Sequence, residues 1–282
     1  MLDAGIANVT YLLRQRFRYD YPGPIAHLRH RLVIAPPLAY GDQLVVRDRL
    51  VVTPTTAVRW ERDGFGNAVA TLIASRIDES IDLDYEAVIR RSAGPHPHLC
   101  DDWFDDERLL RPSALTAPDE ALRDAASALR REHDADRYAL AAQINAYVFE
   151  HMRYVADVTN VATTAAQAFA QGTGVCQDYA HIMIALSRLN GLAARYVSGH
   201  LLGEGGTHAW VEVIGEPLGD GTVPVWGFDP THRRTTTLSY VFVAAGRDFA
   251  DVTPTSGCFV APYIGKFSTY RSVEIVGEED AA

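Results

Sequence analysis

Residues 172–189, GTGVCQDYAHIMIALSRL, join a loop of small residues to an amphipathic helix. The apolar residues recur at the three- and four-residue spacing that predicts one buried helical face: Tyr179, Ile182, Met183, Leu186 and Leu189. Gly191 predicts the end of this helix, because glycine is common just past a helix C-terminus. Thr173 is expected to cap its start, which places Cys176 in the first turn.

This position of Cys176 favours the reactive thiolate form. The first turn of a helix has unpaired backbone N–H groups and the positive end of the macrodipole, and both attract an anion. A helix N-terminus together with a cationic neighbour is a known way to activate a thiol as a nucleophile. The alternative is a buried structural cysteine, since free cysteines are mostly buried and inert.

A β-hairpin that follows the helix in the sequence supplies partners for the thiol. Two strand-like runs, at 209–214 and 223–228, flank a stretch rich in glycine, proline and aspartate, which predicts a hairpin with a long loop. If the hairpin turns at its midpoint, His208 lies directly opposite Asp229. Asp229 would then hold one imidazole nitrogen while the other faces the thiol of Cys176.

Three stretches resemble the catalytic blocks of the bacterial transglutaminase-like superfamily, whose core is papain-like: GVCQDYAH at 174–181, HAWVE at 208–212 and GFDPT at 227–231. Two more extend the similarity over nearly the whole chain: DGFGN at 63–67, which resembles the family's N-terminal domain, and GRDFADV at 246–252, which resembles its segment after the aspartate. The resemblance implies that Cys176 is the nucleophile, that His208 is its base and acid, and that Asp229 orients the imidazole. His232 departs from the family's pattern, because many members carry asparagine there.

The activity that the resemblance implies is thiol-dependent acyl transfer on an amide bond of a peptide or protein, through a thioester. This chemistry needs neither a metal nor an organic cofactor. Resemblance to bacterial members favours hydrolysis, as in a peptidase or amidase. The alternatives are a transglutaminase that transfers the acyl group to an amine, and a non-catalytic domain that binds a peptide in the same cleft.

The length and the residue patterns predict two domains. Alternating apolar and polar residues over 1–92 predict an antiparallel β-sandwich. Residues 93–117, rich in proline, histidine and aspartate, are interpreted as a linker. Residues 118–282, with helices expected at 117–133 and 138–151, would form the papain-like transglutaminase core with a C-terminal strand. The expected fold class is α+β, an N-terminal sandwich followed by this core.

Composition excludes some partners. The formal net charge is −10, which argues against binding to nucleic acid, since that depends on clustered Lys and Arg. No apolar run is long enough to span a membrane, and residues 1–18 lack the layout of a signal peptide, so the expected location is the cytoplasm. Three cysteines fit reduced thiols better than disulfides. The sandwich could recruit a partner or form a homo-oligomer, and no residue decides this.

Other candidate sites carry weaker patterns. His96, His98 and Cys100 have the side chains of a zinc site, but no second pair of ligands follows at the usual spacing. Asp178 and His181 lie one helical turn apart and are explained equally well by dipole complementarity and packing. The stretch VSGH at 197–200 lacks the pattern around a nucleophilic serine.

Overall fold

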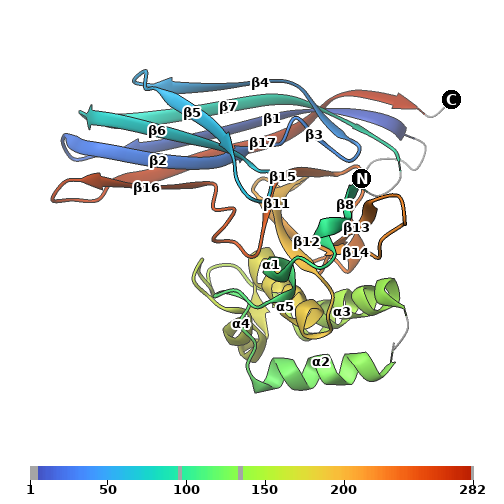
Figure 1. Cartoon of the computed structure of the whole chain (residues 1–282). Helices are drawn as coiled ribbons and strands as arrows, with labels where there is room; N and C mark the ends of the chain where they lie inside the picture. Colours follow the sequence, from blue (N-terminus) through green and yellow to red (C-terminus); the bar gives the residue numbers. More distant parts are fainter. Residues whose placement is uncertain (1–5, 95–96, 133–135, 281–282) are drawn as a thin grey trace.

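The computed structural model describes residues 6–94, 97–132 and 136–280. It contains a β-sandwich, a further antiparallel sheet and a group of helices, and Figure 1 shows that sheet between the sandwich and the helices. The α+β class expected from the sequence is confirmed. Within the described ranges, no helix combines the length and the apolar character that crossing a membrane requires.

The sandwich is built from two antiparallel sheets. The larger has the order β17-β1-β7-β4-β3 and consists of β1 (Ile6–Asp20), β3 (Ala39–Tyr40), β4 (Gln43–Thr53), β7 (Ser80–Ser92) and β17 (Lys266–Asp280). The smaller has the order β16-β2-β6-β5 and consists of β2 (Ile25–Ala35), β5 (Val58–Arg62), β6 (Ala68–Ile77) and β16 (Thr255–Val260). Alternation explains the packing: in β1, Val9, Tyr11 and Leu13 are fully buried, because every second side chain faces the other sheet.

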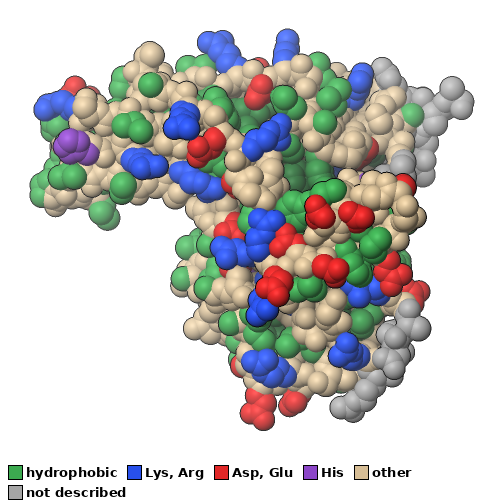
Figure 2. All heavy atoms as spheres, viewed as in Figure 1, with side chains coloured by type: hydrophobic (Ala, Val, Ile, Leu, Met, Phe, Trp, Pro, Cys, Tyr) green, Lys and Arg blue, Asp and Glu red, His purple; other side chains and the backbone are tan. Residues whose placement is uncertain are grey.

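The last two strands differ from the predicted division of the chain, which placed all of 118–282 in the core. β17 pairs with β1 along its whole length, and β16 pairs with β2, so the C-terminal segment completes both sheets of the sandwich. Without them, β1 and β2 would be long unpaired edges, which proteins avoid. Local sequence patterns do not reveal such distant pairing. Figure 2 shows the sandwich extending beyond the core on one side.

The core combines its sheet with a buried helix. The sheet has the order β14-β13-β12-β11-β15 and consists of β11 (Ala194–Leu201), β12 (His208–Ile214), β13 (Thr222–Asp229), β14 (Arg234–Thr235) and β15 (Tyr240–Gly246). The helices are α1 (Glu107–Leu110), α2 (Glu120–Glu132), α3 (Arg137–His151), α4 (Ala165–Gln171) and α5 (Cys176–Leu189). The three predicted helices correspond to α2, α3 and α5. α5 is buried on all sides from Asp178 to Arg188, because β12 covers one side and the other helices cover the rest.

Much of the predicted linker, 93–117, belongs to the core. β8 (His98–Cys100) pairs with β13, and the short helix η1 (Asp101–Trp103) and α1 follow it. Leu109 of α1 is fully buried, and its carbonyl accepts a hydrogen bond from the guanidinium of Arg188 in α5. The aspartates of this segment serve local structure: Asp101 and Asp102 lie in η1, and Asp106 caps α1.

Side-chain amides hold the sandwich against the edge of the core sheet. Gln43 donates to the carbonyl of Phe242 at 2.9 Å and accepts from the backbone N–H of that residue at 2.9 Å. Asn67, in the turn between β5 and β6, makes the same pair of bonds with Ala245, at 2.7 and 2.8 Å. Both amides take the place of a neighbouring strand along β15, which is the last strand of its sheet. The hydrogen bonds from these two side chains to the backbone of β15 therefore hold the sandwich in position against the core.

Candidate active site

Cys176 is the first residue of α5, as the position of the amphipathic pattern predicted. The expected cap was wrong: Thr173 belongs to the short strand β10 (Thr173–Gly174), which pairs with β9 (Arg153–Tyr154), and the N-cap is Val175. Valine has no polar side chain, so Asp178 performs the capping. Its carboxylate accepts the backbone N–H of Val175 at 2.8 Å and the hydroxyl of Thr159 at 2.7 Å. A residue from the first turn of α5 therefore stabilises the helix N-terminus, where Cys176 lies.

The hairpin that carries the other two predicted residues forms with a different register. Val211 pairs with Phe228, whereas the midpoint turn would have placed it opposite Trp226. The pairing is shifted by two residues, which leaves every side chain on the same face of the sheet. His208 and Asp229 therefore remain neighbours, and Nε2 of His208 lies 2.9 Å from Oδ2 of Asp229.

Asp229 is fully buried and its carboxylate is saturated with hydrogen bonds. Oδ2 accepts from Nε2 of His208, from Nδ1 of His232 at 2.7 Å and from the hydroxyl of Tyr240 at 2.6 Å. Oδ1 accepts the backbone N–H of Thr231 at 3.0 Å. Burial alone would raise the pKa of Asp229, but the hydrogen bonds from His208 and His232 outweigh it and hold this pKa well below its usual range. The carboxylate is ionised at neutral pH.

His208 is buried and held from both sides. Nε2 faces Asp229, while Nδ1 lies 3.0 Å from Oε2 of Glu204. Burial opposes the charged imidazolium, but hydrogen bonds to Asp229, to the thiol of Cys176 and to Glu204 outweigh it and raise the pKa of His208 to about 12. The Nδ1 side of the ring thus faces both Cys176 and Glu204. The fold brings the three predicted site residues together, with the imidazole between the thiol and the buried carboxylate.

Three residues of this cluster were not predicted as site residues. Glu204 lies in the loop between β11 and β12, and its other oxygen is 3.4 Å from Nε2 of His232. His232 was noted only as a departure from the family's pattern, and it proves to be a second imidazole on Asp229. Tyr240 begins β15 and also accepts a hydrogen bond from Arg234. The spacing of three residues between Asp229 and His232 could have predicted that these two side chains meet. Glu204 and Tyr240 belong to no local motif, so the sequence could not have predicted their contacts.

A cavity of about 500 Å³ opens in front of the thiol and the imidazole. Its walls come from both parts of the molecule. The core contributes Tyr154, Val161, Val175, Cys176, Gln177, Tyr196, Ser198, Thr207, His208, Ala209 and Phe249. The C-terminal segment contributes Pro254, Thr255, Phe267 and Arg271. Because β16 and β17 belong to the sandwich, the N-terminal domain helps to build the site.

The ligand atoms of His208, Asp229 and His232 lie within 4.8 Å of one another, which raises the question of a metal. Both imidazoles point at the same oxygen, Oδ2 of Asp229, at hydrogen-bond distances of 2.9 and 2.7 Å. Zinc would instead need ligands about 2.0–2.2 Å from a common centre. The contacts of these three residues are explained by hydrogen bonds alone. Of the zinc candidates weighed in the sequence, His96 lies outside the described residues, and His98 and Cys100 belong to β8.

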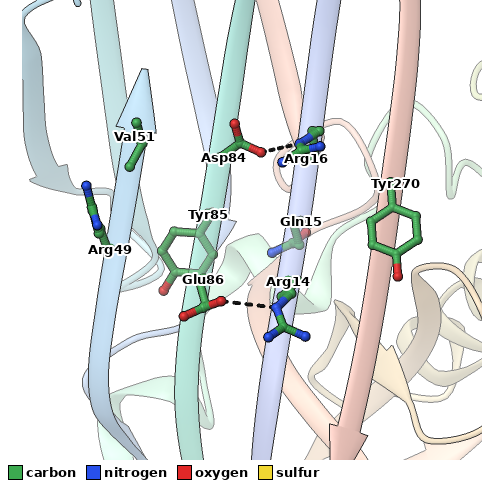
Figure 3. A pocket seen from close by; sticks show the side chains of 9 residues that line it. All are labelled: Arg14, Gln15, Arg16, Arg49, Val51, Asp84, Tyr85, Glu86 and Tyr270. Carbon is green, nitrogen blue, oxygen red and sulfur yellow. Dashed lines mark hydrogen bonds and ion pairs between the residues drawn. The ribbon is translucent and has the colours of Figure 1, made fainter. Parts of the chain in front are cut away.

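A second cavity, of about 450 Å³, lies on the outer face of the larger sandwich sheet and is drawn in Figure 3. Arginines of β1 and carboxylates of β7 line it and pair across the strands, Arg14 with Glu86 at 3.0 Å and Arg16 with Asp84. These side chains are largely exposed and neutralise one another. The surface is a ladder of cross-strand ion pairs. Arg49 also lines this surface, and the described residues that line the cavity include neither a cysteine nor a histidine.

Comparison with protein families identifies both parts of the chain. Residues 123–222 match the transglutaminase-like superfamily, and residues 11–90 match the bacterial transglutaminase-like N-terminal region. The first match contains Cys176 and His208 and ends before Asp229.

Relatives among curated proteins come from mycobacteria. An uncharacterized protein from Mycobacterium leprae (strain TN) is 30% identical over 168 residues, which is 56% of this chain and 56% of the relative. An uncharacterized protein from Mycobacterium tuberculosis (strain ATCC 25618 / H37Rv) is 27% identical over 279 residues, which is 88% of this chain and 86% of the relative. The similarity to the first relative thus spans little more than half of its length.

Among solved structures, the chain is similar to one described as "a Putative Cysteine Protease from Cytophaga hutchinsonii", with a TM-score of 0.76 and 18% identity. The similarity covers 97% of this chain and 93% of that one. At this level of identity it establishes the fold, which includes the sandwich as well as the core.

Proposed function

Since this chain belongs to the transglutaminase-like superfamily, we propose that it is a thiol enzyme that transfers the acyl group of a peptide or protein amide. One observation carries the proposal. His208, with one ring nitrogen on the buried carboxylate of Asp229, directs its other side to Cys176, and both Cys176 and His208 line the same cavity. The helix N-terminus and the imidazolium both favour a thiolate at this position.

In the proposed reaction, the thiol proton of Cys176 resides on Nδ1 of His208, and the sulfur attacks the amide carbonyl carbon. The new C–S bond converts the carbonyl into a tetrahedral oxyanion. The backbone N–H of Cys176, at the start of α5, is one donor to that oxyanion. As the C–N bond breaks, Nδ1 returns its proton to the departing nitrogen, which leaves as an amine, and the acyl group stays on the sulfur of Cys176 as a thioester.

The thioester is then resolved by a second nucleophile. His208, now neutral, takes a proton from water, and the resulting hydroxyl attacks the thioester carbon. Cys176 leaves as the thiolate, and the products are a carboxylic acid and the free enzyme. Throughout both steps Asp229 holds Nε2–H and stabilises the imidazolium. Neither step requires a metal or an organic cofactor.

Water is the proposed acceptor, and a primary amine is the alternative. The two are separated by incubating the enzyme with a glutamine-containing protein and a fluorescent primary amine. Hydrolysis converts the side-chain amide to an acid and leaves the protein unlabelled, whereas crosslinking activity attaches the fluorescent amine covalently. A peptide-binding role without catalysis would leave the protein unchanged in both respects.

The nucleophile is tested by alkylation with iodoacetamide over a pH series, followed by intact-mass analysis and peptide mapping. Cys100 and Cys258 are exposed, whereas Cys176 is half-buried, so accessibility alone predicts that Cys176 reacts last. We expect Cys176 to react first at neutral pH. Cys176→Ala should abolish turnover, and the matched variant Cys258→Ala should retain it. Turnover that persists in Cys176→Ala would refute the assignment.

A further inference from the structure

Arg271 occupies a position in β17 where the fold expects an apolar side chain. Side chains alternate along the strand, and the row that faces inward includes Phe267, Val273 and Ile275, which pack against other apolar groups. The neighbouring residue Tyr270 faces outward, onto the ion-pair ladder of Figure 3. A charged residue in an inward-facing row is unfavourable unless it has a function.

Among the described residues, the charge of Arg271 meets an aromatic ring but no carboxylate. Its Nε is buried without a hydrogen bond, and among the described residues the guanidinium forms no ion pair. It lies over the ring of Phe17, 5.1 Å from the centroid. By contrast, Arg14 and Arg16, on the adjacent strand β1, are each paired with a carboxylate. Burial lowers the pKa of Arg271, although Tyr19 offsets part of this effect. Arginine nevertheless stays protonated in proteins, so this charge is costly unless something binds it.

The same side chain lines the cavity of the candidate active site, together with Cys176 and His208. The other walls are largely apolar and aromatic, from Tyr154, Tyr196 and Phe249 among others. No aspartate or glutamate occurs among the described residues that line it. The charge of His208 is already balanced by Asp229 and Glu204, whereas that of Arg271 is not. An anion that neutralises Arg271 would have to arrive with the substrate.

We propose that Arg271 is a specificity residue that binds a carboxylate of the substrate in the active-site cavity. A guanidinium recognises a carboxylate through two parallel hydrogen bonds, which gives both affinity and orientation. The carboxylate belongs either to an acidic side chain near the reacting amide or to the free C-terminus of a peptide. This inference rests on the proposed function for the identity of the cavity as the substrate cleft. It adds the class of substrate, namely peptides that present a carboxylate near the reacting amide.

The test measures binding separately from turnover, in the Cys176→Ala background. Capped peptides that differ only in Glu or Gln at one position are titrated, each with an amidated or a free C-terminus. We expect a carboxylate-containing peptide to bind roughly 10- to 100-fold more tightly than its neutral partner, as for a hydrogen bond to a charged group. Arg271→Met keeps the apolar stem and should remove this preference, while Arg271→Lys should restore part of it.

Arg16→Met is the matched control, because Arg16 lies in the same sheet but faces outward and does not line this cavity. It should keep the full preference. A preference for Glu peptides identifies a side-chain carboxylate, and a preference for the free terminus identifies a C-terminal one. Equal binding of all four peptides, including no measurable binding of any, would overturn the inference.

Failure of this inference and failure of the proposed function give different results. Turnover that depends on Cys176 but shows no preference for a carboxylate rejects the role of Arg271 alone. A carboxylate preference that Arg271→Met abolishes, in a protein with no turnover, rejects the catalytic proposal and retains the binding site. Alkylation of Cys176 in versions of the Arg271 and Arg16 variants that retain this cysteine, compared with wild type, reports whether the cavity is intact.

Discussion

The buried network around Asp229 and the exposed ladder on the outer sandwich face use the same kinds of charge under opposite conditions. Asp229 is fully buried and its oxygens accept four hydrogen bonds. In the ladder, Arg14 and Glu86 are each about half exposed, at 46% and 51%. Water competes for exposed charges and screens them, whereas a buried charge that loses its partners has nothing to replace them. Removing one partner of an ion pair is therefore expected to lower the free energy of unfolding far more in the buried network than in the exposed ladder.

The largest expected effect comes from removing the carboxylate at the centre of the buried network. Asp229→Ala leaves the imidazolium of His208 and the side chains of His232 and Tyr240 without their common acceptor. Breaking a buried pair in this way should lower the free energy of unfolding by about 3–5 kcal/mol, and turnover should be lost as well. Asp84→Ala, the matched change in the ladder, should cost less than about 1 kcal/mol. Urea unfolding of the two variants measures both. Similar losses would mean that burial does not distinguish the two regions.

Glu204 lies between these extremes, because it contacts the buried His208 but is itself 39% exposed. Its hydrogen bond contributes to the raised pKa of His208. Glu204→Gln should therefore lower that pKa, and the alkaline limb of the pH–rate profile should move to lower pH.

The same substitution should change the pH dependence of stability. In the wild type, the pKa of His208 rises on folding from 6.5 to about 12. The contribution of this histidine to the free energy of unfolding is therefore complete below pH 6.5 and is lost as pH approaches 12. The stability difference between wild type and Glu204→Gln should shrink over the same range. An unshifted alkaline limb would show that Glu204 does not act on the imidazole.

The smallest effect is expected for a single pair of the ladder. Arg14→Met should change the free energy of unfolding by less than about 1 kcal/mol, because both partners are exposed. That small difference should shrink further in high salt, which screens exposed charges but not buried ones. Unfolding measured at low and at high ionic strength provides the check, with Asp229→Ala as the salt-insensitive reference. If Arg14→Met greatly lowered the free energy of unfolding even at high ionic strength, the proposed difference between the exposed ladder and the buried network would be wrong.

The hairpin illustrates how a sequence prediction can be wrong in detail and useful in outcome. The turn was placed at the midpoint of the loop, yet the strands pair two residues away from that register. His208 and Asp229 still meet, because a shift by an even number of residues keeps both side chains on one face. The start of α5 shows the same pattern. Thr173 is not the cap, but the apolar periodicity located Cys176 at the helix N-terminus.

Residues that reach the site from distant strands were not predictable in this way. Glu204, Tyr240 and Arg271 belong to different elements, and no spacing in the chain relates them to Cys176. The segment 255–280 was assigned to the core for the same reason, because its strands show alternation but not the identity of their partners. The alternation of apolar and polar residues can be read from neighbouring positions in the chain. The pairing of a strand depends on which sheet, formed by distant segments, has a free edge.

The sequence by itself determined the alternating strands of the sandwich, the helices α2, α3 and α5, the α+β class and the order of Cys176, His208 and Asp229, because these follow from periodicity and local motifs. Only the tertiary structure decided that the C-terminal strands close the sandwich and bring Arg271 into the cavity of the thiol. It also decided that a second imidazole, a tyrosine and a glutamate surround the buried pair. The physical reason is that the environment of a charge is set by burial and by contacts between distant segments, and neither is written in local sequence.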